Sequence, residues 1–101
     1  TAVIQINIRA LRERKADSSS LRRYEEIARW VTGDQHAEAE NASRWMKDLC
    51  VRLAIPGLKQ LGIEASDFEV IVENAKRSSS MKGNPIELTE AELTEILEIS
   101  F

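Results

Sequence analysis

The order of apolar and polar positions along the chain predicts helices. Ile4, Ile8 and Leu11 repeat at spacings of four and three residues, which places them on one face of a helix that ends near Arg14. The polar turn 17–20 then supplies an N-cap for a second helix. That second helix carries a similar apolar stripe, made of Leu21, Tyr24, Ile27, Ala28 and Val31.

The third helix has the most regular pattern in the chain. Gly33 is a suitable C-cap for the helix before it, because glycine tolerates the left-handed conformation that often ends a helix. Pro56 stops the third helix and favours an extended conformation at Ile55. The positions between them match a buried amphipathic helix, with the apolar stripe Ala42, Trp45, Met46, Leu49, Cys50 and Leu53.

Two capping-box spacings mark the last two helices. Ser66 and Glu69 are three residues apart, as are Thr89 and Glu92. The first of these helices is expected to bury Phe68, Ile71, Val72 and Ala75, and the second Leu93, Ile96 and Leu97. No two-residue alternation persists, so no sheet is expected. The pattern predicts an all-α fold, an irregular bundle of about five helices in one domain over residues 1–101.

Composition and charge narrow the class of protein. Apolar residues make up 43% and charged residues 31%, an ordinary balance for a globular domain. No apolar run approaches the roughly 20 residues of a membrane helix, so we expect no membrane partner. A single cysteine, Cys50, cannot form an internal disulfide, which favours a reducing cytoplasm. Residues 1–30 hold seven Lys and Arg against four Asp and Glu, but without interleaved aromatic residues we expect no nucleic-acid binding.

Few residues carry recognisable chemistry. His36 is the only histidine and stands in a polar loop, which indicates a surface residue rather than a metal ligand. Cys50 lies on an apolar stripe and is interpreted as a buried structural thiol. Trp30 and Trp45 are interpreted as core or interface anchors. The series Glu92, Glu95 and Glu98 is interpreted as the solvated face of the last helix. We therefore predict no catalytic, cofactor-binding or metal-ligating residue in this chain.

The loop Ser78–Pro85 is the exception. It gathers three serines, Lys82, a glycine and Asn84 between two well-marked helices. One interpretation is a solvated connector. The other is that its hydroxyl, amide and ammonium groups line a cleft made with another domain, since binding residues concentrate on loops held by rigid elements.

This loop also carries a family resemblance. The run 79–86 with its Asn84-Pro85 pair, followed by Thr89 and Glu92, resembles the C-terminal end of the iron-containing (group III) alcohol dehydrogenases, which close with an Asn-Pro loop and then a Thr-x-x-Glu helix. Further matching pieces lie in the same order over nearly the whole chain, at residues 23–28, 53–58, 61–63, 67–68 and 75.

The resemblance implies both a fold and an activity. The fold would be the C-terminal part of the dehydroquinate synthase-like helical domain. In that family an N-terminal Rossmann-like domain binds NAD(P), and the helical domain holds a divalent metal, usually iron, through one Asp and three His. The matching region begins after the last of these histidines, and the chain opens with apolar residues and no Met. We therefore expect a piece of a larger enzyme that lacks its metal and cofactor sites and is inactive alone.

The resemblance also assigns a place to the loop. In the family the segment before Asn-Pro approaches the substrate cleft, and Ser80 stands where some members have a cysteine near the substrate. Ser80, Lys82 and Asn84 are therefore predicted to form part of the cleft wall. The expected partners are the N-terminal and metal-binding portions of the parent, with a homodimer through exposed apolar helix faces as a further possibility. The alternative is a free-standing helical interaction module.

Overall fold

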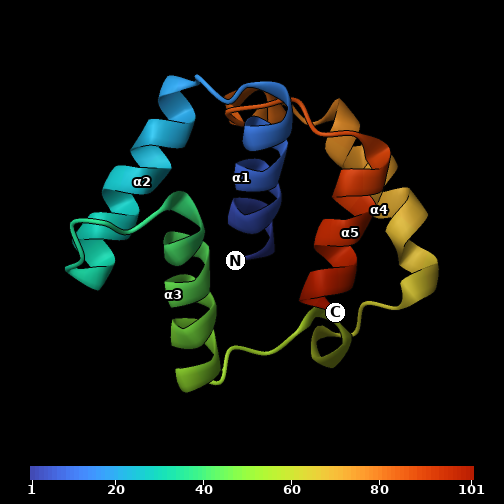
Figure 1. The fold of residues 1–101 in the computed structure, drawn as a ribbon. Coiled ribbons are helices and arrows are strands. Elements are labelled where there is room, and N and C mark those ends of the chain that lie inside the picture. The colour runs from blue at the N-terminus through green and yellow to red at the C-terminus, as the bar shows by residue number, and fades with distance from the viewer. The chain divides into compact units, whose positions relative to one another are not determined.

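The computed structural model describes all residues from 1 to 101 and contains five α-helices, three short 3₁₀ helices and no strand (Figure 1). The all-α prediction is confirmed. The chain divides into two units, residues 1–55 and residues 56–101. The expectation of one domain over residues 1–101 stays a prediction. No helix combines the length and the apolar character needed to cross a membrane.

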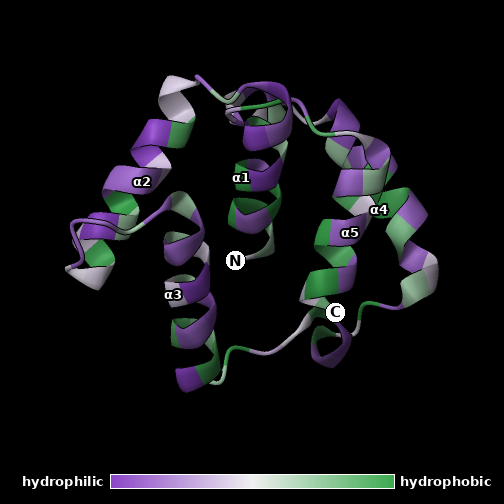
Figure 2. Cartoon of the chain, in the orientation of Figure 1, coloured by the Kyte–Doolittle hydropathy of each residue, from purple (hydrophilic) through white to green (hydrophobic).

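The first unit consists of α1 (Ala2–Arg14), α2 (Ser19–Thr32) and α3 (Ala39–Arg52). Of its helix pairs, α2 and α3 pack together most extensively, and α1 contacts both. Small residues make the close approach of α2 and α3 possible, because Ala28, Ala37 and Ala42 form one buried cluster. Figure 2 shows apolar and polar residues interleaved along these helices. The largest fully buried side chains of the chain all belong to α1, and they are Ile6, Asn7, Ile8 and Leu11.

Both ends of α2 follow from local chemistry. The Ser18 side chain accepts a hydrogen bond from the backbone N–H of Ser20 at 3.1 Å and so caps the first turn. At the other end Gly33 has a φ of 71°, in the left-handed region, and its N–H donates to the Arg29 carbonyl at 2.9 Å. Both caps were predicted from the sequence and are confirmed. His36 is exposed, as predicted.

The prediction for the apolar stripe of α3 is wrong in part. Ala42 is buried, but Met46, Leu49 and Cys50 are only half-buried, and the exposed fractions of Trp45 and Leu53 are 37% and 62%. The buried residues of α3 gather instead in its first turns, at Ala39, Ala42 and Ser43. Periodicity identifies a face of a helix, but neighbouring helices decide how far along that face the burial extends. Cys50 is therefore not the fully buried thiol that was expected.

The second unit holds the remaining elements. They are η1 (Leu58–Leu61), η2 (Ala65–Asp67), α4 (Phe68–Arg77), η3 (Ser79–Gly83) and α5 (Glu90–Ser100). Helices α4 and α5 pack against each other, with Val72 and Leu93 buried. The rings of Phe68 and Phe101 meet edge to face with their centroids 5.4 Å apart, a favoured aromatic geometry. This contact joins the start of α4 to the residue that follows α5.

One capping box of the second unit is confirmed and the other is displaced. At α5 the Thr89 N–H donates to Glu92 Oε2 at 2.8 Å, and the Glu92 N–H donates to Thr89 Oγ1 at 3.2 Å. Glu92 is buried by this arrangement, so its assignment to a solvated face was wrong. Ahead of α4 the reciprocal bond runs instead from the Glu64 N–H to Asp67 Oδ2 at 2.8 Å, because a short turn, η2, precedes the helix. The predicted Ser66 cap is therefore incorrect.

Candidate functional site

The predicted loop is largely a short helix in the structure. Ser78 has extended backbone angles, with φ −72° and ψ 131°, and serves both as the C-cap of α4 and as the N-cap of η3. Its N–H donates to the Ala75 carbonyl at 3.0 Å, and its own carbonyl accepts from the Met81 N–H at 3.2 Å. The change of direction between α4 and η3 is therefore made at a single residue, which ties η3 to the end of α4.

The hydroxyl groups of Ser78 and Ser80 contact each other. Their Oγ atoms are 2.7 Å apart, and Ser78 Oγ also accepts a bond from the Ser80 N–H at 3.4 Å. Both residues are exposed. An exposed pair of hydroxyls at this distance can donate to, or accept from, a molecule placed beside it, because each hydroxyl has one donor and two acceptor positions.

Asn84 stiffens the exit of the loop. Its Nδ2 donates to the Ile86 carbonyl at 2.7 Å across Pro85, whose ring fixes one backbone angle and removes one donor. Its backbone N–H donates to the Met81 carbonyl at 3.1 Å. Ile86 and Leu88 are both buried, so the chain leaves the loop anchored at two apolar positions. Both of these Asn84 bonds go to backbone carbonyls within residues 81–86.

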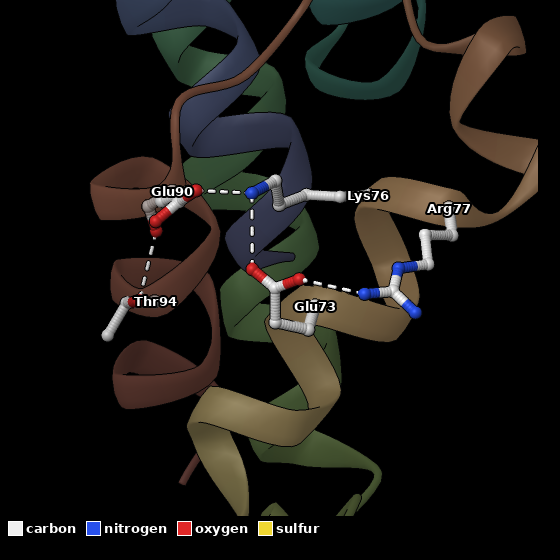
Figure 3. A network of polar contacts seen from close by, with 5 residues as sticks. All are labelled: Glu73, Lys76, Arg77, Glu90 and Thr94. Carbon is white, nitrogen blue, oxygen red and sulfur yellow. Dashed lines mark hydrogen bonds and ion pairs between the residues drawn. The ribbon is translucent and has the colours of Figure 1, made fainter.

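Charged residues connect the two helices that flank the loop (Figure 3). The Lys76 ammonium donates to Glu73 Oε1 at 3.2 Å and also to Glu90 Oε1, which joins the last turn of α4 to the first residue of α5. Arg77 Nη2 lies 3.5 Å from Glu73 Oε2. Thr94 Oγ1 donates to the backbone carbonyl of Glu90 at 2.9 Å. A polar network therefore joins the two helix ends between which the loop, with η3, runs.

The network also changes the titration of its central cation. Hydrogen bonds to Glu90 first, and to Glu73 second, raise the pKa of Lys76 above its ordinary value. The Lys76 side chain is 38% exposed, so water and salt screen these interactions. Lys76 consequently acts as a permanently charged clamp and not as a group that releases a proton near neutral pH.

The three predicted cleft-wall residues all belong to this short stretch but make different contacts. Ser80 bonds to Ser78, Asn84 bonds to Ile86, and Lys82 is exposed on η3. Their assignment to a cleft wall stays a prediction. The Lys76 network was not predicted from the sequence. The spacing of Glu73, Lys76 and Arg77 at three and four residues would have indicated the part of it that lies within α4.

The chain holds no group of residues that fits a metal ion. Nowhere in residues 1–101 do three His, Cys, Asp or Glu side chains come together as a metal-ligating group. His36 is exposed, and its backbone N–H donates to Asp34 Oδ1 at 2.8 Å in a local turn. The residues present therefore do not fit an iron site.

A family model of known proteins matches this chain over its full range. A family model described as Fe-containing alcohol dehydrogenase family, C-terminal, matches residues 1–101. The chain belongs to the Fe-containing alcohol dehydrogenase family. Its all-helical fold agrees with the C-terminal helical part of that family, as the resemblance implied. No curated protein and no solved structure matches the chain.

The match to the Fe-containing alcohol dehydrogenase family includes the loop and the helices on both sides of it. The matched range includes α4, the loop with η3, and α5. In this member, the Asn-Pro pair is held by the Asn84 side chain, and the helix after it begins with the Thr89 and Glu92 capping box. The two motifs that carried the resemblance are thus both backbone-shaping motifs in the structure.

Proposed function

We propose that the intact protein carrying this chain is an NAD(P)-linked alcohol dehydrogenase, which interconverts an alcohol and an aldehyde or ketone by hydride transfer. The observation that supports this proposal is the match of the Fe-containing alcohol dehydrogenase family, C-terminal, along all 101 residues. This chain is then the C-terminal helical portion of the enzyme. The family implies iron, or another divalent metal, and NAD(P) in the parent protein.

The metal and the nicotinamide belong, in this proposal, to parts of the enzyme other than these residues. This placement is supported by the chemistry of residues 1–101, in which no three His, Cys, Asp or Glu side chains form a group that could hold a metal ion. The contribution of this chain is to position a loop beside the substrate. The clamp made by Lys76 and Glu90, and the bond from Asn84 to Ile86, hold the loop still so that it can form one wall of a substrate cleft.

Within that wall the three predicted residues take different parts. The exposed hydroxyls of Ser78 and Ser80 offer hydrogen bonds to a polar group of the substrate, and the exposed Lys82 offers a positive charge. Asn84 acts as a positioning residue through the loop backbone. No residue of this chain is assigned a catalytic role.

We further propose that the partners of this chain are the remaining portions of its parent. Several large apolar side chains of the first unit are exposed, and they support such a surface. The exposed fractions are 76% for Trp30, 71% for Val51 and 57% for Ile55. A homodimer through these faces, or a free-standing interaction module, would use the same side chains. Size-exclusion chromatography of the intact protein and of its Trp30→Ser variant tests the homodimer, which predicts that the variant becomes monomeric.

The activity is tested with the purified intact protein. It is loaded with Fe²⁺ and offered a panel of primary and secondary alcohols with NAD⁺ and, separately, with NADP⁺, and the formation of reduced nicotinamide is followed. We expect turnover with at least one alcohol and with one of the two cofactors. The 101-residue chain, treated in the same way, should give none. Absence of turnover by the intact protein in both directions of the reaction would contradict the proposal, and turnover by the chain alone would contradict the placement of the metal and cofactor elsewhere.

A further inference from the structure

A cavity of about 550 Å³ lies between α1 and α3 in the first unit. Charged side chains dominate its lining. Four are cationic and two are carboxylates, which leaves an excess of positive charge, and the six are Arg9, Arg12, Glu13, Glu40, Arg44 and Lys47. The volume lies in the range of small-molecule sites, roughly 300–1,000 Å³. Nothing in the proposed dehydrogenase activity uses this place.

An ion pair between Arg12 and Glu40 joins the two helices that form the cavity. Arg12 Nη2 donates to Glu40 Oε2 at 2.7 Å, and Arg12 Nε donates to Glu40 Oε1, so the pair is bidentate. This hydrogen bonding holds the pKa of Glu40 below its ordinary value, and the nearby charge of Arg44 contributes in the same direction. Glu40 therefore stays ionised near neutral pH. Its carboxylate competes with a bound anion for the positive charges of Arg12 and Arg44.

Two of the three cations of α3, Arg44 and Lys47, lie on the same face as Glu40. Glu40, Arg44 and Lys47 follow each other at spacings of four and three residues, which places them in one row along the helix. Two further lining residues are buried, the apolar Ile8 and the hydroxyl-bearing Ser43. Cations beside buried protein surface are favourable for an anion, since a nearby low-dielectric region strengthens the attraction between opposite charges.

We propose that this cavity is a binding site for a small phosphate-bearing molecule. Arg44 and Lys47 are its main contacts, and Arg12 is shared between the ligand and Glu40. The excess of two positive charges in the lining matches a dianionic phosphate group. Guanidinium groups suit this ligand because their planar N–H pairs match two phosphate oxygens at once. No aromatic side chain lines the cavity, which disfavours a single-stranded nucleic acid, whose bases stack on aromatic rings.

The experiment uses isothermal titration calorimetry on the intact protein, with inorganic phosphate and inorganic pyrophosphate as probes. Sulfate and acetate at matched ionic strength distinguish phosphate recognition from simple charge attraction. Arg44→Gln and Lys47→Gln should each weaken binding roughly tenfold, as expected for the loss of a charged hydrogen bond. Glu40→Gln should tighten binding several-fold, because it removes the carboxylate that competes for Arg12 and Arg44.

Arg52→Gln is the matched control. It removes the same charge from an exposed position on the same helix, outside the cavity, and should leave the affinity unchanged. Equal weakening by Arg52→Gln and Arg44→Gln would overturn the proposal, as would weaker binding in Glu40→Gln or tighter binding of acetate than of phosphate. Tighter binding of an oligonucleotide than of pyrophosphate would also overturn it. Thermal melting of each variant verifies that the fold is retained, and Glu40→Gln gives a result of opposite sign that loss of folding cannot produce.

Discussion

The ammonium of Lys76 donates a hydrogen bond to the carboxylate of Glu90, fourteen residues further along the chain (Figure 3). This contact joins the last turn of α4 to the first residue of α5. Everything between them, including η3 and the Asn-Pro pair, is a connection whose two ends are held by that contact. The order of the loop should therefore depend on it.

Replacing Lys76 with Met should loosen the loop while the helices remain. The substitution keeps a long side chain but removes the charge that both Glu73 and Glu90 share. We expect faster amide hydrogen exchange at residues 79–83, and only a small fall in overall stability, because the pair is exposed to solvent. Added salt should reproduce the effect in the unmodified protein by screening the charges. Lys47→Met, in the other unit, is the control, and equal exchange at residues 79–83 in both variants would contradict the role of the clamp.

The capping box of α5 gives a second prediction. Thr89→Ala removes the oxygen that accepts from the Glu92 N–H, and we expect a loss of about 1 kcal/mol in the free energy of unfolding. The matched control is Thr94→Ala, which removes a hydroxyl from the same helix that bonds only to the Glu90 carbonyl. Urea denaturation of both variants measures the difference. An equal loss of unfolding free energy in Thr94→Ala and Thr89→Ala would show that the cap contributes no more than an ordinary hydroxyl.

Short-range signals in the sequence were the ones that could be predicted. The Ser18 cap, the Gly33 C-cap and the Thr89–Glu92 box each depend on residues within a few positions of each other, so their spacing alone encodes them. The displaced cap before α4 shows the limit of such reasoning. Glu64 with Asp67 and Ser66 with Glu69 have the same spacing, and the backbone turn η2 selects the first pair.

Long-range contacts could not be predicted from the sequence. Arg12 and Glu40 are 28 residues apart, and only the packing of α1 against α3 brings them together. The same holds for Glu90, whose partner Lys76 belongs to another helix. The exposure of Trp45 has a related cause, because periodicity names a face but tertiary packing decides which part of that face is covered.

Gly33, the one glycine of the first unit, is expected to tolerate alanine poorly. Its positive φ strains any residue with a Cβ, although no atom lies within 4 Å of where that Cβ would stand. Gly33→Ala should therefore lower the free energy of unfolding by about 1 kcal/mol through backbone strain alone. Gly33→Asn should cost less, because asparagine tolerates this conformation better. Gly83→Ala, at a glycine with equally open space but without a positive φ, should be nearly neutral in the same denaturation experiment.

The Arg12–Glu40 pair predicts a pH dependence of stability. The pKa of Glu40 is lowered in the folded state, mainly by its hydrogen bonds from Arg12. The ionised form therefore stabilises the fold above the ordinary pKa of a glutamate, and this contribution is lost as the pH falls through the lowered value. Glu40→Gln should remove the loss of stability that comes from protonation of Glu40 at acidic pH. Urea denaturation over a series of acidic pH values should show a flatter profile for Glu40→Gln than for the unmodified protein. Parallel profiles would show that the pair contributes nothing.

The proposed cleft wall gives the last prediction, which applies to the intact enzyme. Ser80→Ala and Lys82→Gln should raise KM for the alcohol roughly fivefold, as expected for the loss of one hydrogen bond of about 1 kcal/mol, with a smaller effect on kcat. Asn84→Ala should lower kcat and also speed amide exchange at residues 79–83, because it releases the Ile86 carbonyl and loosens the loop. Ser66→Ala, an exposed serine outside the loop, is the control. A KM unchanged in both Ser80→Ala and Lys82→Gln would remove these residues from the substrate cleft, and an effect of Asn84→Ala on kcat without faster exchange would show that Asn84 acts on the substrate and not through the loop.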